Sequence, residues 1–584
     1  MKRAQLESVT SEVVGNALMS IAEQMGMVLV RSAYSTNIKE RKDCSSAVFG
    51  PKGRLVALAE HIPLHLSSMQ GLVAEIARKS GIWCLRAGDV IIANDPYKGG
   101  GSHLPDITLV QPVFYERNMV AFVANIAHWS DVGGRLPGIG TAGDSTELLQ
   151  EGLRIPPTRI ISEGVIRTDN LDFILINMRN RTERLGDFHA QIASLRLGER
   201  KVMDLFKRYG TETINACIEE ILDYSERQLK AAILNVPEGD YDFEDALDDD
   251  GITDNTLAIR VLVSISHEPE ASICFDFSGT ETQARGGINM VWSALLASVF
   301  YALKAILVPK VPLNAGFQRP IKIKAQEGSV VNAQEPAAVG GRADTCQRVV
   351  DTIMGAFGKV VPEKIVAASN GATTAIIIAG TKSMTGRDFV FVEALGGGMG
   401  AKFNRDGIDG IQVHMTNTSN LPIEAAELEY PIRILHYGLV PDSGGPGKFR
   451  GGLAIRKDIE FLRPVLFSAH SDRHRIPPWG VRGGLSGSCG KFVLDPDSPT
   501  ERILPSKTSG IKIDRNQILR VFTAGGGGYG EPTLRNPQNA AVDRVSAKVS
   551  DRQLREIYGV EVSPQGEIDW RATQALRNRK RKGQ

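Results

Sequence analysis

The stretch DITLVQPVFYERNMVAFVANIAHW, residues 106–129, decides how the N-terminal part of this chain is interpreted. Residues 107–115 and 119–128 are rich in β-branched and aromatic side chains, and the polar residues 116–118 lie between them. Two such runs around a short polar turn predict a β-hairpin. Pro112 lacks a backbone N–H and therefore indicates a sheet edge or a β-bulge.

The base of this hairpin gathers side chains that can bind a metal ion. If the hairpin folds about residue 117, Asp106 lies opposite His128, with the two Cβ atoms about 5 Å apart. His103 precedes Asp106 by three residues, and Pro105 keeps that connection extended. Two imidazoles and a carboxylate in one place fit Zn²⁺ or Mn²⁺. The structural alternative is a hydrogen-bonded His/Asp cluster that only fixes the hairpin, and a register error of one residue would separate the pair.

Helical and strand patterns alternate along the rest of the chain. Apolar residues at spacings of three and four predict helices, and short apolar runs bounded by turn residues predict strands. The predicted helices cover residues 9–31, 67–77, 290–303 and 344–357, with a charge-rich helical block over 171–235. The predicted strands outside the hairpin cover residues 45–49, 55–59 and 89–94. The helix at 344–357 is expected to start at a cap formed by Asp344 and Thr345.

These patterns predict a mixed α/β fold with a β-rich, metal-bearing N-terminal part, a helical middle and a β-rich C-terminal half. The predicted regions are residues 1–236 with the metal site, a mixed α/β region over 237–360, a glycine-rich and β-rich region over 361–540, and a helical tail with a basic end over 541–584. No internal repeat of fixed period is visible in the sequence.

The composition narrows the class of protein. Lys and Arg number 68 against 67 Asp and Glu, so the net charge of +1 creates no global field for nucleic acid or an anionic membrane. Hydrophobic content of 42% and charged content of 23% are typical of a globular protein. The six cysteines include no CxxC pair, so neither a zinc ribbon nor a dithiol redox motif is expected. So few cysteines in 584 residues favour a reducing, cytoplasmic location. The apolar run 290–303 is shorter than the roughly 20 residues of a membrane span, so we expect a core helix.

Two glycine clusters, at residues 396–400 and 525–530, have the composition of phosphate-binding loops. Such a loop requires a helix N-terminus directly after it, and neither cluster is followed by a helical pattern. The chain also lacks a GxxxxGK motif followed by Ser or Thr. The clusters are therefore predicted to form turns or closely packed backbone, and we expect no nucleotide site in this chain.

Several segments, in order from about residue 7 to residue 532, resemble the hydantoinase B/oxoprolinase family. They include NIKERKDCSSAVFG, LAEHIPLHLSSMQG, NDPYKGGGSHLPDITLV, NIAHWSDVGG, EGLRIPP, VHMTNTSNLPIE, PDSGGPGKFRGG and FTAGGGGYGEP. That family contains the B components of ATP-dependent N-methylhydantoinases, the C-terminal half of 5-oxoprolinase, caprolactamase, and large subunits of acetone and acetophenone carboxylases. The resemblance implies a two-component enzyme, in which an A-type ATPase partner phosphorylates the substrate and this chain completes the reaction at a metal.

The resemblance also implies a set of site residues. The family carries zinc or manganese on a His-x-x-Asp pair and a later His, which correspond to His103, Asp106 and His128. Asp43 is the expected fourth ligand, although the family usually has Phe at the position of Cys44 and a shorter turn before the first His. Three further side chains are expected either to support the site or to be structural. They are His61 and His65, as proton shuttles or partners of the ligands, and Asp131, which could orient His128.

Three functions remain open at the level of sequence. The first is a hydantoinase-type hydrolase that opens a cyclic amide, works in a hetero-oligomer and uses ATP only through its partner. The second is a carboxylase that joins an activated ketone to bicarbonate, and the third is an assembly subunit without chemistry of its own. Carboxylates near His103 and His128 in sequence favour hydrolysis, because bicarbonate prefers flanking cations and only Lys98 and Arg135 are near.

Overall fold

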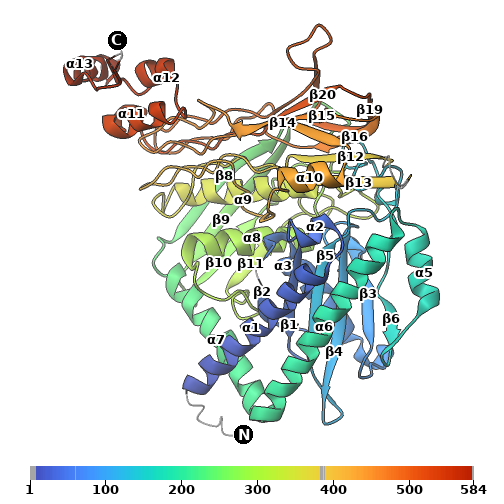
Figure 1. Ribbon diagram of the computed structural model, residues 1–584. Coiled ribbons are helices and arrows are strands. Elements are labelled where there is room, and N and C mark those ends of the chain that lie inside the picture. The colour runs from blue at the N-terminus through green and yellow to red at the C-terminus, as the bar shows by residue number, and fades with distance from the viewer. Residues whose placement is uncertain (1–7, 60, 382–385, 387, 564, 582–584) are drawn as a thin grey trace.

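An antiparallel sheet of seven strands forms the N-terminal part of the molecule (Figure 1). The computed structural model describes residues 8–59, 61–381, 386, 388–563 and 565–581. The strand order in the sheet is β2-β1-β5-β4-β3-β6-β7. The strands are β1 Cys44–Phe49, β2 Leu55–Ala59, β3 Val90–Ala93, β4 Asp106–Tyr115, β5 Asn118–His128, β6 Thr158–Ser162 and β7 Val165–Ile166. The three strands predicted outside the hairpin are confirmed as β1, β2 and β3.

The predicted hairpin is confirmed, and its register is the expected one. Asp106 pairs with His128, so the start of β4 lies beside the end of β5. The turn is shorter than predicted, because only Glu116 and Arg117 connect the strands, both with positive φ angles of 48° and 66°. Strand β4 lies between β5 and β3, but Pro112 pairs only with Phe122 of β5 and lies beyond the residues 108–110 that pair with β3, so the predicted local edge or bulge is confirmed. The register shift falls just after Pro112, between residues 113 and 114.

The helices of the N-terminal half cover this sheet and join it to a second one. They are α1 Ser8–Ser32, α2 Thr36–Lys39, α3 Leu66–Arg78, α4 Ser80–Trp83, α5 Thr168–Ile176, α6 Arg181–Tyr209, α7 Thr211–Ile233, α8 Trp292–Leu307 and α9 Arg342–Gly358. The second sheet has the order β11-β10-β9-β8, built from β8 Gly239–Leu247, β9 Leu257–Ser266, β10 Ser272–Asp276 and β11 Ile321–Lys324. All the predicted helices are confirmed, with the charge-rich block divided into α5, α6 and α7.

Helix α9 is buried along nearly its whole length, from Arg342 to Phe357. It packs against α8 and against strands β8 and β9. The predicted cap at Asp344 and Thr345 is wrong, because the helix begins at Arg342 after Gly341. The Asp344 carboxylate instead bonds to groups of the C-terminal half, which the local sequence pattern does not reveal.

The C-terminal half contains two further sheets, which lie together at one end of the molecule (Figure 1). One has the order β13-β12-β16-β19, from β12 Ala375–Thr381, β13 Asp388–Ala394, β16 Val465–His470 and β19 Lys507–Ile513. The other has the order β14-β15-β20-β17-β18, from β14 Ile432–Leu439, β15 Ile455–Phe461, β17 Lys491–Leu494, β18 Arg502–Leu504 and β20 Ile518–Phe522. The remaining helices are α10 Ile423–Glu429, α11 Pro537–Val545, α12 Asp551–Glu556 and α13 Trp570–Arg581.

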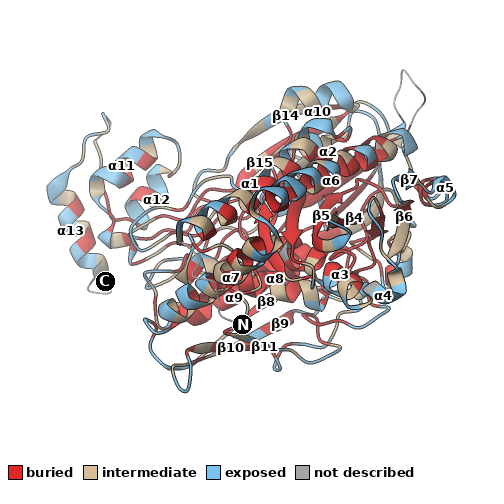
Figure 2. Ribbon diagram, turned by 90° about the horizontal axis from the view of Figure 1, so that it is seen from below, coloured by how far each residue is buried: buried red, intermediate tan, exposed pale blue. Residues whose placement is uncertain are grey.

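Buried side chains of the described residues form two large clusters and two small ones, and the buried segments are coloured red in the ribbon of Figure 2. The first core runs from Val14 to Ile365 and includes Met415, the second lies between Ile376 and Val521, and the third joins α11 and α12. The first core crosses the predicted border at residue 236, and the division into domains stays a prediction. The mixed α/β class with a β-rich C-terminal half is confirmed.

The segment Val9–Ser32 of helix α1 is long and apolar enough, by length and composition alone, to cross a membrane. Its residues Val14, Met25 and Leu29 are fully buried, and the helix packs against α6 and against β1 and β2. These contacts make α1 a core helix of this fold.

The glycine clusters pack backbone against backbone, as predicted. A Cβ atom on Gly398 would lie 2.0 Å from the carbonyl oxygen of Gly452, and one on Gly526 would lie 2.2 Å from that of Met399. Real Cβ atoms do not approach so closely, so only glycine fits at these positions. The clusters join loops of the C-terminal half to one another.

Candidate active site

A buried cavity of about 60 Å³ lies where the end of the first sheet, the start of α9 and the sheet containing β16 meet. The hairpin register brings Asp106 and His128 to it, and His103 reaches it from the loop before β4. Its polar lining combines four imidazoles, two carboxylates and two guanidinium groups, from His65, His103, His128, His470, Asp43, Asp106, Arg41 and Arg342. The cavity therefore concentrates ionisable groups at the centre of the molecule.

Asp106 is the most heavily bonded of these side chains. Its Oδ1 lies 3.1 Å from His103 Nε2 and 3.5 Å from His65 Nε2. Its Oδ2 accepts hydrogen bonds from Arg342 Nη2 at 3.0 Å and from Ser102 Oγ at 2.9 Å. Burial alone would raise the pKa of Asp106, but His103 and Arg342 hold this pKa well below its usual range, so the carboxylate is ionised.

His103 is a neutral imidazole at physiological pH. Burial and the charge of Arg342 lower its pKa to about 4, against the opposing effect of Asp106. Its Nδ1 atom is buried and has no hydrogen-bond partner in the described part of the chain. A buried nitrogen without a partner costs free energy, so this atom is suited to a ligand.

His128 is oriented by Asn37 and Arg41, which belong to the segment NIKERKDCSSAVFG but were not predicted as site residues. Asn37 Nδ2 lies 3.0 Å from His128 Nδ1 and donates to the His128 carbonyl oxygen at 2.8 Å. Arg41 Nη1 donates to Asn37 Oδ1, which fixes the orientation of this amide. The Asn37 amide therefore donates to Nδ1, and the proton of the neutral His128 ring lies on Nε2.

Asp43 and His65 complete the N-terminal side of the cavity. His65 Nε2 lies 3.9 Å from Asp43 Oδ1, and Ser45 Oγ lies 3.2 Å from His65 Nδ1. The carbonyl oxygen of Asp43 accepts the backbone N–H of His128, so β1 and β5 hold the two residues side by side. Burial raises the pKa of the Asp43 carboxylate, against the opposing charges of His65 and Arg41.

The donor set fits a divalent ion by its chemistry. Imidazole and carboxylate are the ligands that Zn²⁺ and Mn²⁺ share, and His103 Nδ1 lacks a partner among the described residues. However, among residues 8–59, 61–381, 386, 388–563 and 565–581, no three His, Cys, Asp or Glu side chains stand in metal-binding geometry. His103 bonds to Asp106 and Asn37 lies against His128 Nδ1, so an ion would have to compete with these hydrogen bonds.

Two of the sequence-predicted residues lie away from the cavity. The Asp131 carboxylate accepts the backbone N–H groups of Gly133, Gly138 and Arg179, so it fixes the turn after β5 and does not orient His128. His61 packs against α1, where a Cβ on Gly26 would lie 2.4 Å from its Nε2 atom. Of the predicted supporting residues, only His65 lines the cavity. Glu60, a nearby carboxylate in the sequence, lies outside the described residues.

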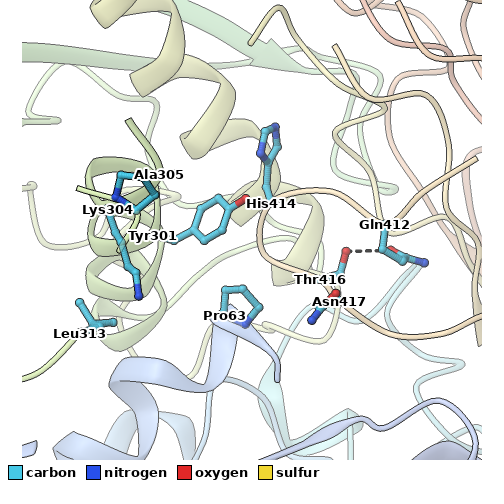
Figure 3. Close-up of a pocket in the computed structure, with 10 residues that line it drawn as sticks. Pro63, Tyr301, Lys304, Ala305, Leu313, Gln412, His414, Thr416 and Asn417 are labelled. Carbon is cyan, nitrogen blue, oxygen red and sulfur yellow. Dashed lines mark hydrogen bonds between the residues drawn. The ribbon is translucent and has the colours of Figure 1, made fainter. Parts of the chain in front are cut away.

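A larger cavity of about 350 Å³ adjoins the first one, since Thr416 lines both. In Figure 3, Tyr301 and Lys304 of α8 lie on one side of it, and Thr416 and Asn417 lie on the other. Burial raises the pKa of Tyr301 to about 12, so its phenol group carries a proton at neutral pH. A cavity of this size suits a small organic molecule.

A buried cavity that gathers imidazoles, carboxylates and guanidinium groups beside a larger pocket defines an enzyme-like site. The chain belongs to the hydantoinase B/oxoprolinase family, whose model matches residues 7–532. A relative from a Pseudomonas species, named as the B component of a D-/L-hydantoinase, is 30% identical over 98% of both chains. The 5-oxoprolinase of Dictyostelium discoideum is 33% identical over 90% of this chain, which corresponds to only 40% of that longer protein.

Two solved structures have the same fold. The ATP-dependent caprolactamase of Pseudomonas jessenii has a TM-score of 0.90 and 28% identity, over 98% of this chain and 100% of its own chain. An acetone carboxylase, solved without nucleotide, has a TM-score of 0.91 over 99% of this chain and 83% of its own, at 18% identity. The resemblance stated from the sequence is therefore confirmed at the level of the family and the fold.

Proposed function

We propose that this chain is the hydrolytic component of an ATP-dependent enzyme that opens a cyclic amide. The observation that carries the proposal is the buried cavity in which His65, His103, Asp106 and His128 meet next to a pocket of substrate size. The caprolactamase supports it, because its likeness to this chain extends over the whole of its length. Hydantoins, 5-oxoproline and small lactams are the substrates of this class.

The proposal includes a Zn²⁺ or Mn²⁺ ion held by Asp43, His103, Asp106 and His128. Such an ion would polarise a carbonyl oxygen and supply water of lowered pKa. The side chains of this protein have three tasks around it. Arg342 and Ser102 keep Asp106 ionised and in place, β1 and β5 keep Asp43 beside His128, and the burial of the cavity excludes bulk water from the reacting carbon.

The proposal also includes an A-type ATPase partner, which would phosphorylate the amide oxygen before this chain acts on it. The hydantoinase relative is named as one component of an enzyme, and the 5-oxoprolinase is a single chain more than twice as long as its matching part. The glycine clusters of this chain are filled by their own backbone contacts. A hetero-oligomer in which ATP binds only to the partner agrees with these observations.

Reconstitution with the ATPase partner tests this function. We expect the pair to release ADP and a ring-opened product in equal amounts with hydantoin, 5-oxoproline or caprolactam. Treatment with a chelator should stop ring opening, and Zn²⁺ or Mn²⁺ should restore it. A pair that consumes ATP with none of these rings, after metal loading, would contradict the proposal.

A carboxylase remains the second candidate, and one observation favours it. Few cations flank His103 and His128 in the sequence, but the fold brings Arg41 and Arg342 to the cavity from other segments. Guanidinium groups bind bicarbonate well. Both are already engaged, Arg342 with Asp106 and Arg41 with Asn37 and the Val392 carbonyl oxygen, and this engagement favours hydrolysis.

An assembly subunit without chemistry, the third alternative, gains no support from the cavity. Burying Asp106 and Arg342, which are 0% and 5% exposed, costs free energy that hydrophobic side chains would not cost. A purely structural subunit has no need of such a site.

A further inference from the structure

The cavity contains one histidine that lies far from the N-terminal ligand set in sequence. His470 is the last residue of β16, is 1% exposed and lines the cavity. Its Nδ1 atom lies 2.9 Å from Asp344 Oδ2. The other Asp344 oxygen accepts the backbone N–H of Thr373 at 2.7 Å, so the carboxylate is held between α9 and the C-terminal sheet.

This arrangement fixes the protonation of the ring. Burial alone would raise the pKa of Asp344, but His470 and the Thr373 N–H lower this pKa by more than burial raises it. The carboxylate is therefore ionised and can only accept hydrogen bonds. In the neutral ring, this hydrogen bond to Asp344 places the proton on Nδ1 and leaves a lone pair on Nε2. The Nε2 atom is buried, and the described residues offer it no hydrogen-bond partner.

An unpartnered nitrogen does not by itself identify a catalytic histidine, because His474 Nε2 is also buried without a hydrogen-bond partner among the described residues. Among the described residues, His474 has neither of two further features of His470, which are a carboxylate bonded to the ring and a place in the cavity wall. It is not among the described residues that line either cavity, and its ring packs against Phe492. His470 combines a carboxylate on one nitrogen, a free lone pair on the other and a place in the cavity wall, which is the arrangement of a general base.

We propose that His470 is the catalytic residue that transfers protons during ring opening, and that Asp344 is its positioning residue. The proposal rests on the hydrolytic function proposed above. His470 Nε2 takes a proton from water while the water oxygen bonds to the carbon of the phosphorylated amide. One electron pair of the C=N bond moves to the nitrogen. The nitrogen then takes that proton from Nε2.

Ring opening follows in a second transfer through the same atom. Nε2 takes the remaining proton of the new hydroxyl group and gives it to the ring nitrogen. The C–N bond breaks, its electron pair stays on nitrogen, and the hydroxyl oxygen forms a C=O bond. The amine is then free, and the acyl phosphate that remains is hydrolysed by a second water to a carboxylate and inorganic phosphate.

The test compares variants of the chain in complex with its ATPase partner, using the cyclic amide that the wild-type pair opens. H470A should lower kcat by about 10²–10⁴-fold, and added imidazole should restore part of the rate. D344N keeps an acceptor for Thr373 but places an N–H donor toward Nδ1, which moves the ring proton to Nε2. We expect D344N to lower kcat by at least about 10²-fold with little change in KM. H474Q is the matched control and should retain wild-type kcat.

Bound metal and thermal unfolding are measured for every variant, and both should match the wild type. If the wild-type complex opens the ring and the kcat of the H470A complex is within about threefold of the wild-type value, the proposed role of His470 is wrong. If H470A loses activity that imidazole does not restore, while D344N keeps full activity, His470 has a structural role and the proposed proton transfer is wrong. A wild-type pair that opens no ring overturns the proposed function itself and, with it, this inference.

Discussion

Asp106 is the residue on which the site depends most, because four side chains meet at its two oxygens. If it is a metal ligand, D106N removes the charge that attracts the ion and leaves the shape almost unchanged. We expect the affinity for Zn²⁺ or Mn²⁺ to fall at least about tenfold, as measured by metal analysis after dialysis.

The control for this prediction is H61Q, since His61 packs against α1 outside the cavity. H61Q should bind as much metal as the wild type. Equal metal content in D106N and the wild type would exclude Asp106 as a ligand and leave a hydrogen-bonded His/Asp cluster as the better description.

Glu151 gives a prediction of pH dependence away from the site. Its Oε1 accepts hydrogen bonds from Ser145 Oγ and from the backbone N–H groups of Val339 and Gly340. Burial nevertheless raises its pKa from 4.5 to about 7. The folded state therefore binds a proton more tightly than the unfolded state, and the free energy of unfolding falls as the pH rises from about 4.5 to 7. The loss is on the order of 3 kcal/mol.

E151Q mimics the protonated carboxyl and removes this loss. The stability of E151Q relative to the wild type should therefore increase between about pH 5 and pH 8, as measured by chemical denaturation at each pH. A difference between the two proteins that does not change with pH would show that Glu151 titrates normally.

Three of the four predicted ligands are indicated by local patterns, whereas Asp43 is indicated only by the family resemblance. Asp106 and His128 follow from the length of one hairpin turn, and His103 from its distance to Asp106. The residues that orient them could not be found in this way. Arg342 and His470 reach the cavity from positions far along the chain, and nothing in their neighbouring sequence marks them as polar partners.

At the scale of elements, the turn of the hairpin carries strain that can be tested. Glu116 and Arg117 are exposed and both have positive φ angles, a conformation that side chains other than Gly and Asn disfavour. Replacing them by Asn and Gly should raise the free energy of unfolding by about 1 kcal/mol, as measured by urea denaturation, without changing bound metal.

The variant R117A separates strain from other effects, because alanine keeps the unfavourable conformation. It should give no gain in stability. An equal gain from R117A would mean that the charge or size of Arg117, rather than its backbone conformation, limits the stability of the turn.

Helix α9 shows why element ends are harder to predict than elements. Its apolar spacing marks a helix, but its charged residues suggest an exposed face that does not exist. Arg348 bonds to Asp245 Oδ1 at 3.0 Å, and Asp351 Oδ1 lies 3.0 Å from His414 Nε2. Partners from distant strands and loops compensate these buried charges, so the apparent cap at Asp344 is a contact to β16 instead.

At the scale of the whole molecule, the site is a junction between halves of the chain. The first sheet supplies Asp106 and His128, α9 supplies Arg342, and the C-terminal sheet supplies His470 and the apolar wall at Ala375 and neighbouring residues. Local patterns predicted the mixed α/β class and the order of its regions, but they could not predict this junction. This junction depends on how the C-terminal core packs against the N-terminal core.

The reaction itself is tested most directly by isotopes in the product. The wild-type chain and its ATPase partner are supplied with ATP and the cyclic amide in ¹⁸O-labelled water that contains ¹³C-labelled bicarbonate. Mass spectrometry then shows which molecule entered the product. Hydrolysis predicts ¹⁸O in the new carboxylate, no ¹³C, and turnover that continues when bicarbonate is removed. Incorporation of ¹³C, with turnover that stops without bicarbonate, would contradict the hydrolytic function and identify the chain as part of a carboxylase.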